Sequence, residues 1–413
     1  MKDPWILGDT IAHIVQNKDE IVSLCKHLES EGNDLRFIQA FLSRKQFLHD
    51  IDWLKDVYQL LKGGGLSNRA LAMFFVPFNQ TMDLWQFIDE VNGEVRKEYW
   101  LKMNASFWGL SPEEKIKGLN ALVEHKRYYS AIDVCYHYAE ELPSAIVADV
   151  LTKAATDQAN EDHQVRSHEI QGLFELFDSR QDIEPKLLLQ LEWYYLPILA
   201  SYGNARSPKN LHKELANNPD FFIEVFKWVY KPESDDATSR QTDKQDEQSQ
   251  ARAMQAYDLL RTWRQIPGLQ ESLIINETFL WEWIEKVRTF AEGYGRLNIA
   301  DAYIGEVLTA YPKSDAVWPP DTICKVIETI NTESLKRNFY TAIINSRGVT
   351  MRGAFDGGDQ ERALAEYHRD LSQLHKDRFP AVASIFEHLT IRYEEDAKRE
   401  DESAEITLKD GAE

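Results

Sequence analysis

The feature that most constrains the fold is a helical spacing of apolar residues that recurs along the chain. Between residues 9 and 28, apolar side chains follow one another at intervals of three, four and seven, which places them on one helix face. Residues 37–61 repeat this spacing before three glycines end the segment. We find no alternating apolar and polar run with a hairpin turn. The pattern therefore predicts an all-α fold.

Prolines that follow a polar residue mark where many of these helices begin. The segment Ser111-Pro112-Glu113-Glu114 combines an N-cap serine, a proline in the first turn and a glutamate that completes a capping box. The polar residue and proline recur at Glu184-Pro185, Ser207-Pro208 and Asn218-Pro219. The short gaps between helical segments predict an α-solenoid of stacked helical hairpins.

One pattern of residues occurs twice and supports this architecture. The two copies share their spacing and a closing proline: Tyr128, Ala131, Cys135, Tyr138 and Pro143, and then Leu297, Ala300, Ile304, Val307 and Pro312. This spacing resembles the second helix of a tetratricopeptide repeat. Lys115 and Gly118 stand where the first helix of such a repeat would carry an aromatic residue and a leucine. The resemblance therefore implies helical hairpins and not true tetratricopeptide repeats.

Several short motifs resemble the C-terminal helical region of large bacterial multidomain proteins that carry helical repeats. They are WPP at 318–320, NSRGV at 345–349, GGDQERALA at 357–365, and LEW at 191–193 with YLP at 195–197. Some of those proteins are suspected of roles in stress or phage defence, and the resemblance implies no known chemistry. The sequence begins inside a helical pattern, so we expect a C-terminal piece of a longer protein or a stand-alone relative of one.

A polar segment divides the chain into two expected halves. Residues 231–250 contain Ala237 as their single apolar residue and have almost nothing to bury, so we expect a flexible linker or loop. This segment separates an N-terminal helical half at 1–230 from a C-terminal helical half at 251–400. A second polar stretch predicts a tail at 401–413.

Charge and cysteine content restrict the partners and the compartment. The 413 residues carry a formal net charge of −21 and show no basic stripe, which argues against nucleic-acid binding. The apolar runs fall short of the ~20 residues that span a bilayer, and no secretory signal opens the sequence. Cys25, Cys135 and Cys324 lie far apart within apolar helical patterns, which predicts buried thiols in a reducing cytoplasm.

No motif for a cofactor, a metal or a nucleophile has the spacing that its chemistry requires. The lysine of the Gly-rich segment 62–67 precedes the glycines, and no strand leads into it as in a phosphate-binding loop. His163 and His168 do not share a helix face, as zinc ligands on a helix would. We therefore expect no catalytic residue, metal or cofactor. The alternative is a hydrolase or nucleotide-dependent enzyme with a site between the two halves.

Consecutive large aromatic residues and two loop arginines are the candidate partner contacts. The aromatic candidates lie in segments that cannot turn all of their rings toward one core, and they are Trp193, Tyr195, Trp281 and Trp283. Phe107 and Trp108 pose the same problem, and Trp281 and Trp283 stand ~200° apart on a helix, so one should be core. The arginines Arg347 and Arg352 lie in a Gly-rich loop ahead of a helix. The arginines suit an anion such as a partner's carboxylate. The structural alternative is that these rings fill gaps between hairpins and that the arginines pair with local carboxylates.

From these features we expect a non-catalytic scaffold, or a sensor or regulatory module of a bacterial system. Its partner would be a protein or a peptide, because a superhelix of hairpins offers a concave groove and no reactive constellation is present.

Overall fold

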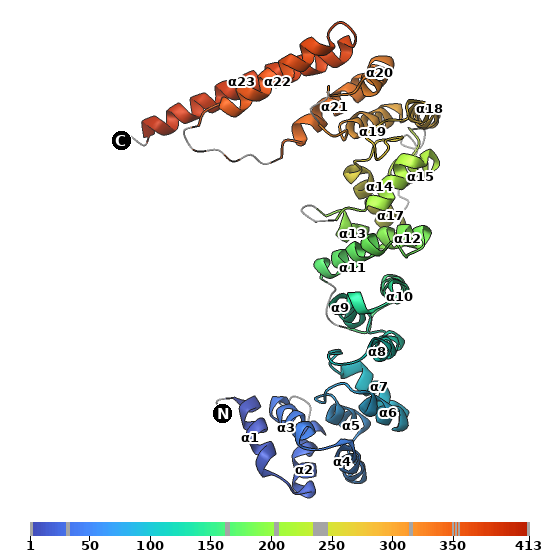
Figure 1. Ribbon diagram of the computed structural model, residues 1–413, viewed down its shortest axis with the longest axis vertical. Coiled ribbons are helices and arrows are strands. Elements are labelled where there is room, and N and C mark those ends of the chain that lie inside the picture. Colours follow the sequence, from blue (N-terminus) through green and yellow to red (C-terminus); the bar gives the residue numbers. More distant parts are fainter. Residues whose placement is uncertain are drawn as a thin grey trace. The chain divides into compact units, whose positions relative to one another are not determined.

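The fold is all-α. The computed structural model describes residues 3–29, 34–161, 166–201, 206–233, 247–313, 317–348, 351, 353 and 356–410. These residues form 22 α-helices and no strand (Figure 1). An isolated antiparallel bridge joins Leu269 and Ile275. The predicted all-α class is confirmed for the described part, where no helix is long and apolar enough to cross a bilayer.

The chain divides into two compact units, Met1–Arg206 and Ser207–Glu413. This division differs from the one expected at the polar segment 231–250. Helix α15 (Pro219–Val229) precedes that segment and packs against α17 (Glu247–Thr262), which follows it, so both belong to the second unit. Residues 234–246 of the expected linker and 411–413 of the expected tail lie outside the described residues, and helix α23 continues through the start of that tail.

The first unit consists of helices that pack on their near neighbours in the sequence. Its α-helices are α1 (Pro4–Ile14), α2 (Lys18–Cys25), α3 (Arg36–Leu48), α4 (Ile51–Gly63), α5 (Asn68–Phe75), α6 (Met82–Glu90), α7 (Gly93–Lys102), α8 (Pro112–Glu124), α9 (Tyr128–His137), α10 (Ser144–Thr156), α11 (Ser167–Arg180), α12 (Pro185–Tyr194) and α13 (Leu196–Leu199). Short 3₁₀ helices occupy Lys26–Glu29 and Ala139–Glu141. Helix α8 contacts α9 and α10, and α9 contacts α10 and α11. Contacts between second neighbours also join α1 to α3, α2 to α4 and α5 to α7.

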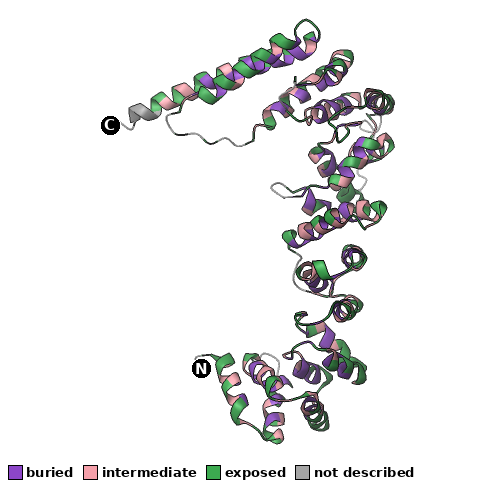
Figure 2. Ribbon diagram, in the orientation of Figure 1, coloured by how far each residue is buried: buried purple, intermediate pink, exposed green. Residues whose placement is uncertain are grey.

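The second unit contains the remaining helices. They are α14 (Lys209–Asn217), α15, α17, α18 (Glu277–Gly293), α19 (Leu297–Leu308), α20 (Asp321–Ile330), α21 (Glu333–Asn345), α22 (Asp359–His375) and α23 (Pro380–Asp410). Helices α22 and α23 lie side by side (Figure 1), and α19 packs against α18 and α21. Buried and exposed residues both occur along the helices (Figure 2), and in α22 the buried positions recur every three or four residues.

Two predicted helix starts have the expected cap. Ser111 caps α8 in a complete capping box with Glu114, and the Asn218 side chain accepts hydrogen bonds at the start of α15. These bonds satisfy backbone N–H groups that have no partner inside the helix. Local side-chain chemistry thus fixes where these two helices begin.

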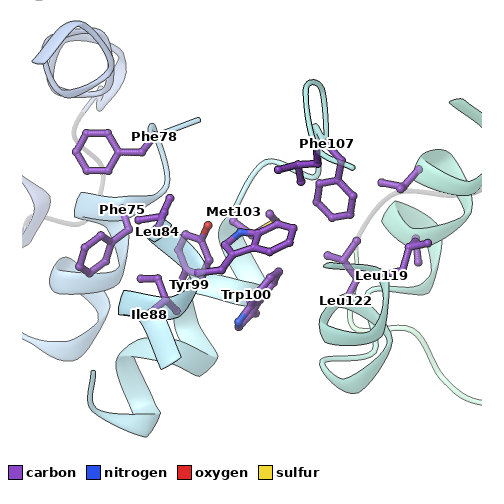
Figure 3. Packing of buried hydrophobic residues seen from close by; sticks show 14 of the residues in the cluster. Phe75, Phe78, Leu84, Ile88, Tyr99, Trp100, Met103, Phe107, Leu119 and Leu122 are labelled. Carbon is purple, nitrogen blue, oxygen red and sulfur yellow. The ribbon is translucent and has the colours of Figure 1, made fainter. Parts of the chain in front are cut away.

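The core of the first unit is rich in aromatic rings. The Trp85 ring lies 5.4 Å from both the Trp100 and the Phe107 rings, measured between centroids. Figure 3 shows Phe107 directed from its loop toward the helix that carries Leu119 and Leu122. All five side chains are buried, so this cluster anchors the loop before α8 to the helices on either side of it.

The two departures from the tetratricopeptide pattern have packing explanations. A Cβ atom at Gly118 would lie 2.6 Å from both Phe107 Cζ and Trp85 Cη2, so a leucine cannot occupy this position. Lys115 is 4% exposed, and its Nζ lies 2.5 Å from Glu141 Oε2. The recurring motif itself faces the interior, since Ala131 of α9 and Ala300 of α19 are both fully buried.

Candidate partner-binding groove

Two of the predicted aromatic contacts lie in the core. Trp283 is 1% exposed and donates its indole N–H to the Leu215 carbonyl over 3.1 Å. Tyr195 is 9% exposed and donates its hydroxyl to the Leu151 carbonyl over 2.9 Å. Both side chains therefore have a structural partner, and neither ring presents a surface to a ligand in this structure.

The other two predicted aromatic residues are half-buried. Trp193 lies on α12, and Trp281 lines a depression of about 390 Å³ along α18. Arg288, which also lines this depression, is engaged by the buried Asp301 carboxylate at 2.8 Å. Trp283 is thus buried and Trp281 half-buried, as expected for two residues that stand ~200° apart on a helix.

Arg347 forms an ion pair with a carboxylate of its own chain. Its Nη2 lies 2.6 Å from Glu361 Oε1, and its guanidinium carbon lies 5.9 Å from the centre of the Tyr393 ring. The Arg347 side chain is 22% exposed and that of Glu361 is 2% exposed. Arg352 lies outside the described residues. Arg347 accordingly neutralises a buried charge, which matches the structural alternative.

Three neighbouring depressions in the first unit have lining residues in common. The central depression has a volume of about 750 Å³. One of about 210 Å³ shares Phe78 and Thr81 with it, and one of about 180 Å³ shares Asn104. The lining of the central depression comprises Trp5, Gln39, 76–82, Asn104, Ser106, 108–110 and Glu114. We call the three depressions together the loop groove, because loops between helices form most of its wall.

A reciprocal amide pair fixes the loop between α5 and α6. The Asn79 backbone N–H donates to Gln46 Oε1 over 2.7 Å, and Gln46 Nε2 donates to the Asn79 carbonyl over 3.3 Å. Gln46 lies on α3, so this pair connects the loop to a helix that precedes it by more than one hairpin. The Asn79 side chain is left free to face a ligand.

The buried side chain of Gln80 stabilises the same loop through three hydrogen bonds. Its Oε1 accepts hydrogen bonds from Trp85 Nε1 over 2.8 Å and from the Tyr99 hydroxyl over 2.5 Å. Its Nε2 donates to the Phe78 carbonyl over 3.0 Å. Burial raises the pKa of Tyr99, so its hydroxyl stays a neutral donor in this network. A satisfied buried network of this kind gives the groove wall a defined shape.

A tight turn presents Trp108 to solvent. The Leu110 N–H donates to the Phe107 carbonyl over 3.3 Å and closes the turn. Gly109 has a φ of +80°, as the third residue of a type II turn requires. Phe107 is 0% exposed and Leu110 is 8% exposed, whereas Trp108 is 85% exposed. The buried residues on both sides hold the indole of Trp108 outward.

The central depression is nearly uncharged. Glu114 is its single ionisable lining residue among the described residues, and it accepts a hydrogen bond from the Ser111 N–H over 2.7 Å. Three other lining residues, Gln39, Asn79 and Asn104, have side-chain amides that form no hydrogen bond with any other residue that the structure describes. Each amide therefore offers both donors and an acceptor to a ligand.

Charged groups line the two smaller depressions. Asp50 and Asp83 lie in the one of about 210 Å³ together with His49. Burial, helped by the Lys45 ammonium, lowers the pKa of His49, so this imidazole is neutral near pH 7. This end of the groove is therefore lined by carboxylates.

Ion pairs occupy the depression of about 180 Å³. Arg127 lies 3.4 Å from Glu161, and Arg166 lies 3.2 Å from Asp133 and 2.8 Å from Glu169. These opposite charges compensate one another, so this end of the groove offers no excess cation to an anionic ligand.

None of the three cysteines of the chain lines the loop groove. Burial raises the pKa of the thiols of Cys25, Cys135 and Cys324 to about 12, and all three are free and buried. Such thiols are protonated near pH 7 and are poor nucleophiles. Within the described residues, no three His, Cys, Asp or Glu side chains form a group that could hold a metal ion.

Comparison of the chain with protein-family models, with curated proteins and with solved structures gives no match. The chemistry of its own surface is therefore the basis for a proposed function. Sequence reasoning pointed to Trp108 through its position beside Phe107. It missed Gln39, Asn79 and Asn104, because isolated polar residues in loops carry no periodic signal.

Proposed function

We propose that this chain is a non-catalytic interaction module whose loop groove binds an extended segment of a partner protein. The observation that carries the proposal is Trp108, a large ring that the turn at 107–110 holds 85% exposed beside the central depression. Tryptophan is enriched among the residues that dominate binding energy at interfaces.

The proposal includes the stacked-hairpin architecture. Contacts between helices that are close in sequence in the first unit support an α-solenoid, in which loops on one edge form a continuous surface. Three buried, free cysteines support a cytoplasmic setting. A role as a scaffold, or as a sensor or regulatory module of a bacterial stress or phage-defence system, rests on the sequence resemblance alone.

Photo-cross-linking tests the proposed function. A benzophenone amino acid would replace Trp108 in the full chain and, as a matched control, Met254, which is 70% exposed and distant from the groove in sequence. We expect position 108 to give a discrete cross-linked partner in cells and position 254 to give none in common with it. Identical products from both positions, or none from position 108, would contradict the proposal.

A further inference from the structure

The central depression selects against charged ligands. Charged residues make up 28% of the chain, yet Glu114 alone among the described lining residues is ionisable, and its carboxylate already accepts a hydrogen bond. A charged side chain that entered this depression would lose water without gaining a partner. An uncharged ligand avoids that cost.

The unpaired amides favour an extended ligand over a helical one. A helix satisfies its own backbone hydrogen bonds, so it would cover Gln39, Asn79 and Asn104 and leave their amides without partners. An extended chain has free carbonyls that these amide N–H groups can reach. No strand is present in the described residues, so an extended ligand would be bound through these side chains and not by addition to a sheet edge.

Two exposed indoles restrict the class of extended ligand further. Trp108 is 85% exposed and Trp5 is 49% exposed, and both line the central depression. Aromatic-lined grooves with hydrogen-bond donors accept proline-rich segments, because the polyproline II chain presents carbonyls and apolar rings and is already ordered before it binds. Each indole N–H is a donor without an acceptor function, which suits a chain whose prolines have no N–H.

We propose that the loop groove selects an uncharged, proline-containing segment in the polyproline II conformation, with an apolar ring packed on Trp108. The inference rests on the proposed function, because it names the ligand class of the same groove. The carboxylates at one end of the groove and the ion pairs at the other would then lie beyond the ends of the neutral core of the segment.

Selection from a random twelve-residue peptide display library tests this inference on the full chain. Wild type, Trp108→Ala and Asn79→Ala/Asn104→Ala would be used in parallel, with Met254→Ala as the control. We expect wild type and the control to enrich peptides that contain proline and lack charged residues at their centres. The selected peptides, synthesised with a fluorophore, should lose roughly thirtyfold or more in affinity with Trp108→Ala and about three- to tenfold with the asparagine variant.

The outcomes distinguish a failure of the polyproline inference from a failure of the proposed binding function. Peptides that depend on Trp108 but carry charged centres, or the apolar spacing of an amphipathic helix, would overturn the polyproline inference and leave the groove as a binding site. If no enriched peptide loses affinity with Trp108→Ala, the proposed function itself fails. The affinity of the expected peptides should also change less than about threefold between 50 and 200 mM NaCl, because no charges are paired.

Discussion

Phe107 and Trp108 are consecutive residues of one turn, yet the first is fully buried and the second is 85% exposed. The turn closes through the Leu110 N–H and depends on the positive φ of Gly109. Phe107 packs on Trp85 at 5.4 Å, so its burial fixes the direction in which Trp108 points. Phe107 therefore contributes to stability, while the adjacent Trp108 is available for recognition.

Alanine substitution should separate these two roles. Phe107→Ala removes a buried ring and should lower the free energy of unfolding by about 3–5 kcal/mol. Trp108→Ala removes an exposed ring and should change it by less than about 0.5 kcal/mol. Urea unfolding followed by circular dichroism measures both. A large loss of stability for Trp108→Ala would show that the indole is covered by the chain itself.

A second prediction concerns Gly118, where α8 crosses the aromatic cluster. The added Cβ of Gly118→Ala would lie 2.6 Å from the Phe107 and Trp85 rings and force them apart, at a cost of about 1–3 kcal/mol. Alanine gains about 1 kcal/mol of helix propensity over glycine, so the net loss should lie between about 0 and 2 kcal/mol and exceed the loss at a glycine with open space around it.

Gly93→Ala is the matched control for this substitution. Gly93 begins α7, and a Cβ atom built there meets no atom within 4 Å. We expect no loss of stability for this variant. If Gly118→Ala were equally neutral, the aromatic cluster would have to be looser than the structure shows.

The sequence was sufficient to predict the fold class, because helical spacing and capping are local properties. The Ser111 capping box and the burial of Ala131 and Ala300 follow directly from such patterns. The division of the chain was not predictable in the same way. A polar segment at 231–250 looks like a boundary, but whether the helices on either side of it pack together depends on contacts between residues distant in sequence.

The candidate site was only partly predictable for the same reason. A pair of neighbouring aromatic residues shows that one ring must leave the core, and this argument applies to Phe107 and Trp108. It does not show which pair borders a groove, because the groove arises where the 76–82 and 104–110 loops meet. Burial of Trp283 and Tyr195 likewise depends on the Leu215 and Leu151 carbonyls, which no local pattern indicates.

Arg347 should prove to be a stabilising residue. Arg347→Ala would leave the buried Glu361 carboxylate without its cation at 2.6 Å, and we expect the free energy of unfolding to fall by about 1–3 kcal/mol. Arg399→Ala, at a side chain 69% exposed, should cost less than about 0.5 kcal/mol. A role in anion binding would show the opposite result, in which Arg347→Ala is as stable as wild type but binds its partner less tightly.

The last prediction concerns two buried histidines of the second unit. His212 is 5% exposed and His368 is 2% exposed. Burial lowers the pKa of each to about 4, with a smaller contribution from Arg264 for His212 and from Lys313 for His368. The His368 ring stacks between Phe386 and Tyr393, so a proton placed on it would have no solvent around it.

Because the folded pKa of both histidines lies below the ordinary value of 6.5, the unfolded chain binds protons first as the pH falls. Their contribution to stability is therefore complete above about pH 7 and is lost progressively between pH 6.5 and 4. Each histidine should reduce the free energy of unfolding by roughly 1–2 kcal/mol between pH 7 and pH 5.

Urea unfolding at several pH values measures this slope. His368→Phe keeps an apolar ring beside its neighbours and should flatten the slope, whereas Met254→Ala, at an exposed position without an ionisable group, should not. A slope for His368→Phe equal to that of wild type would mean that His368 already exchanges its proton with solvent in the folded state.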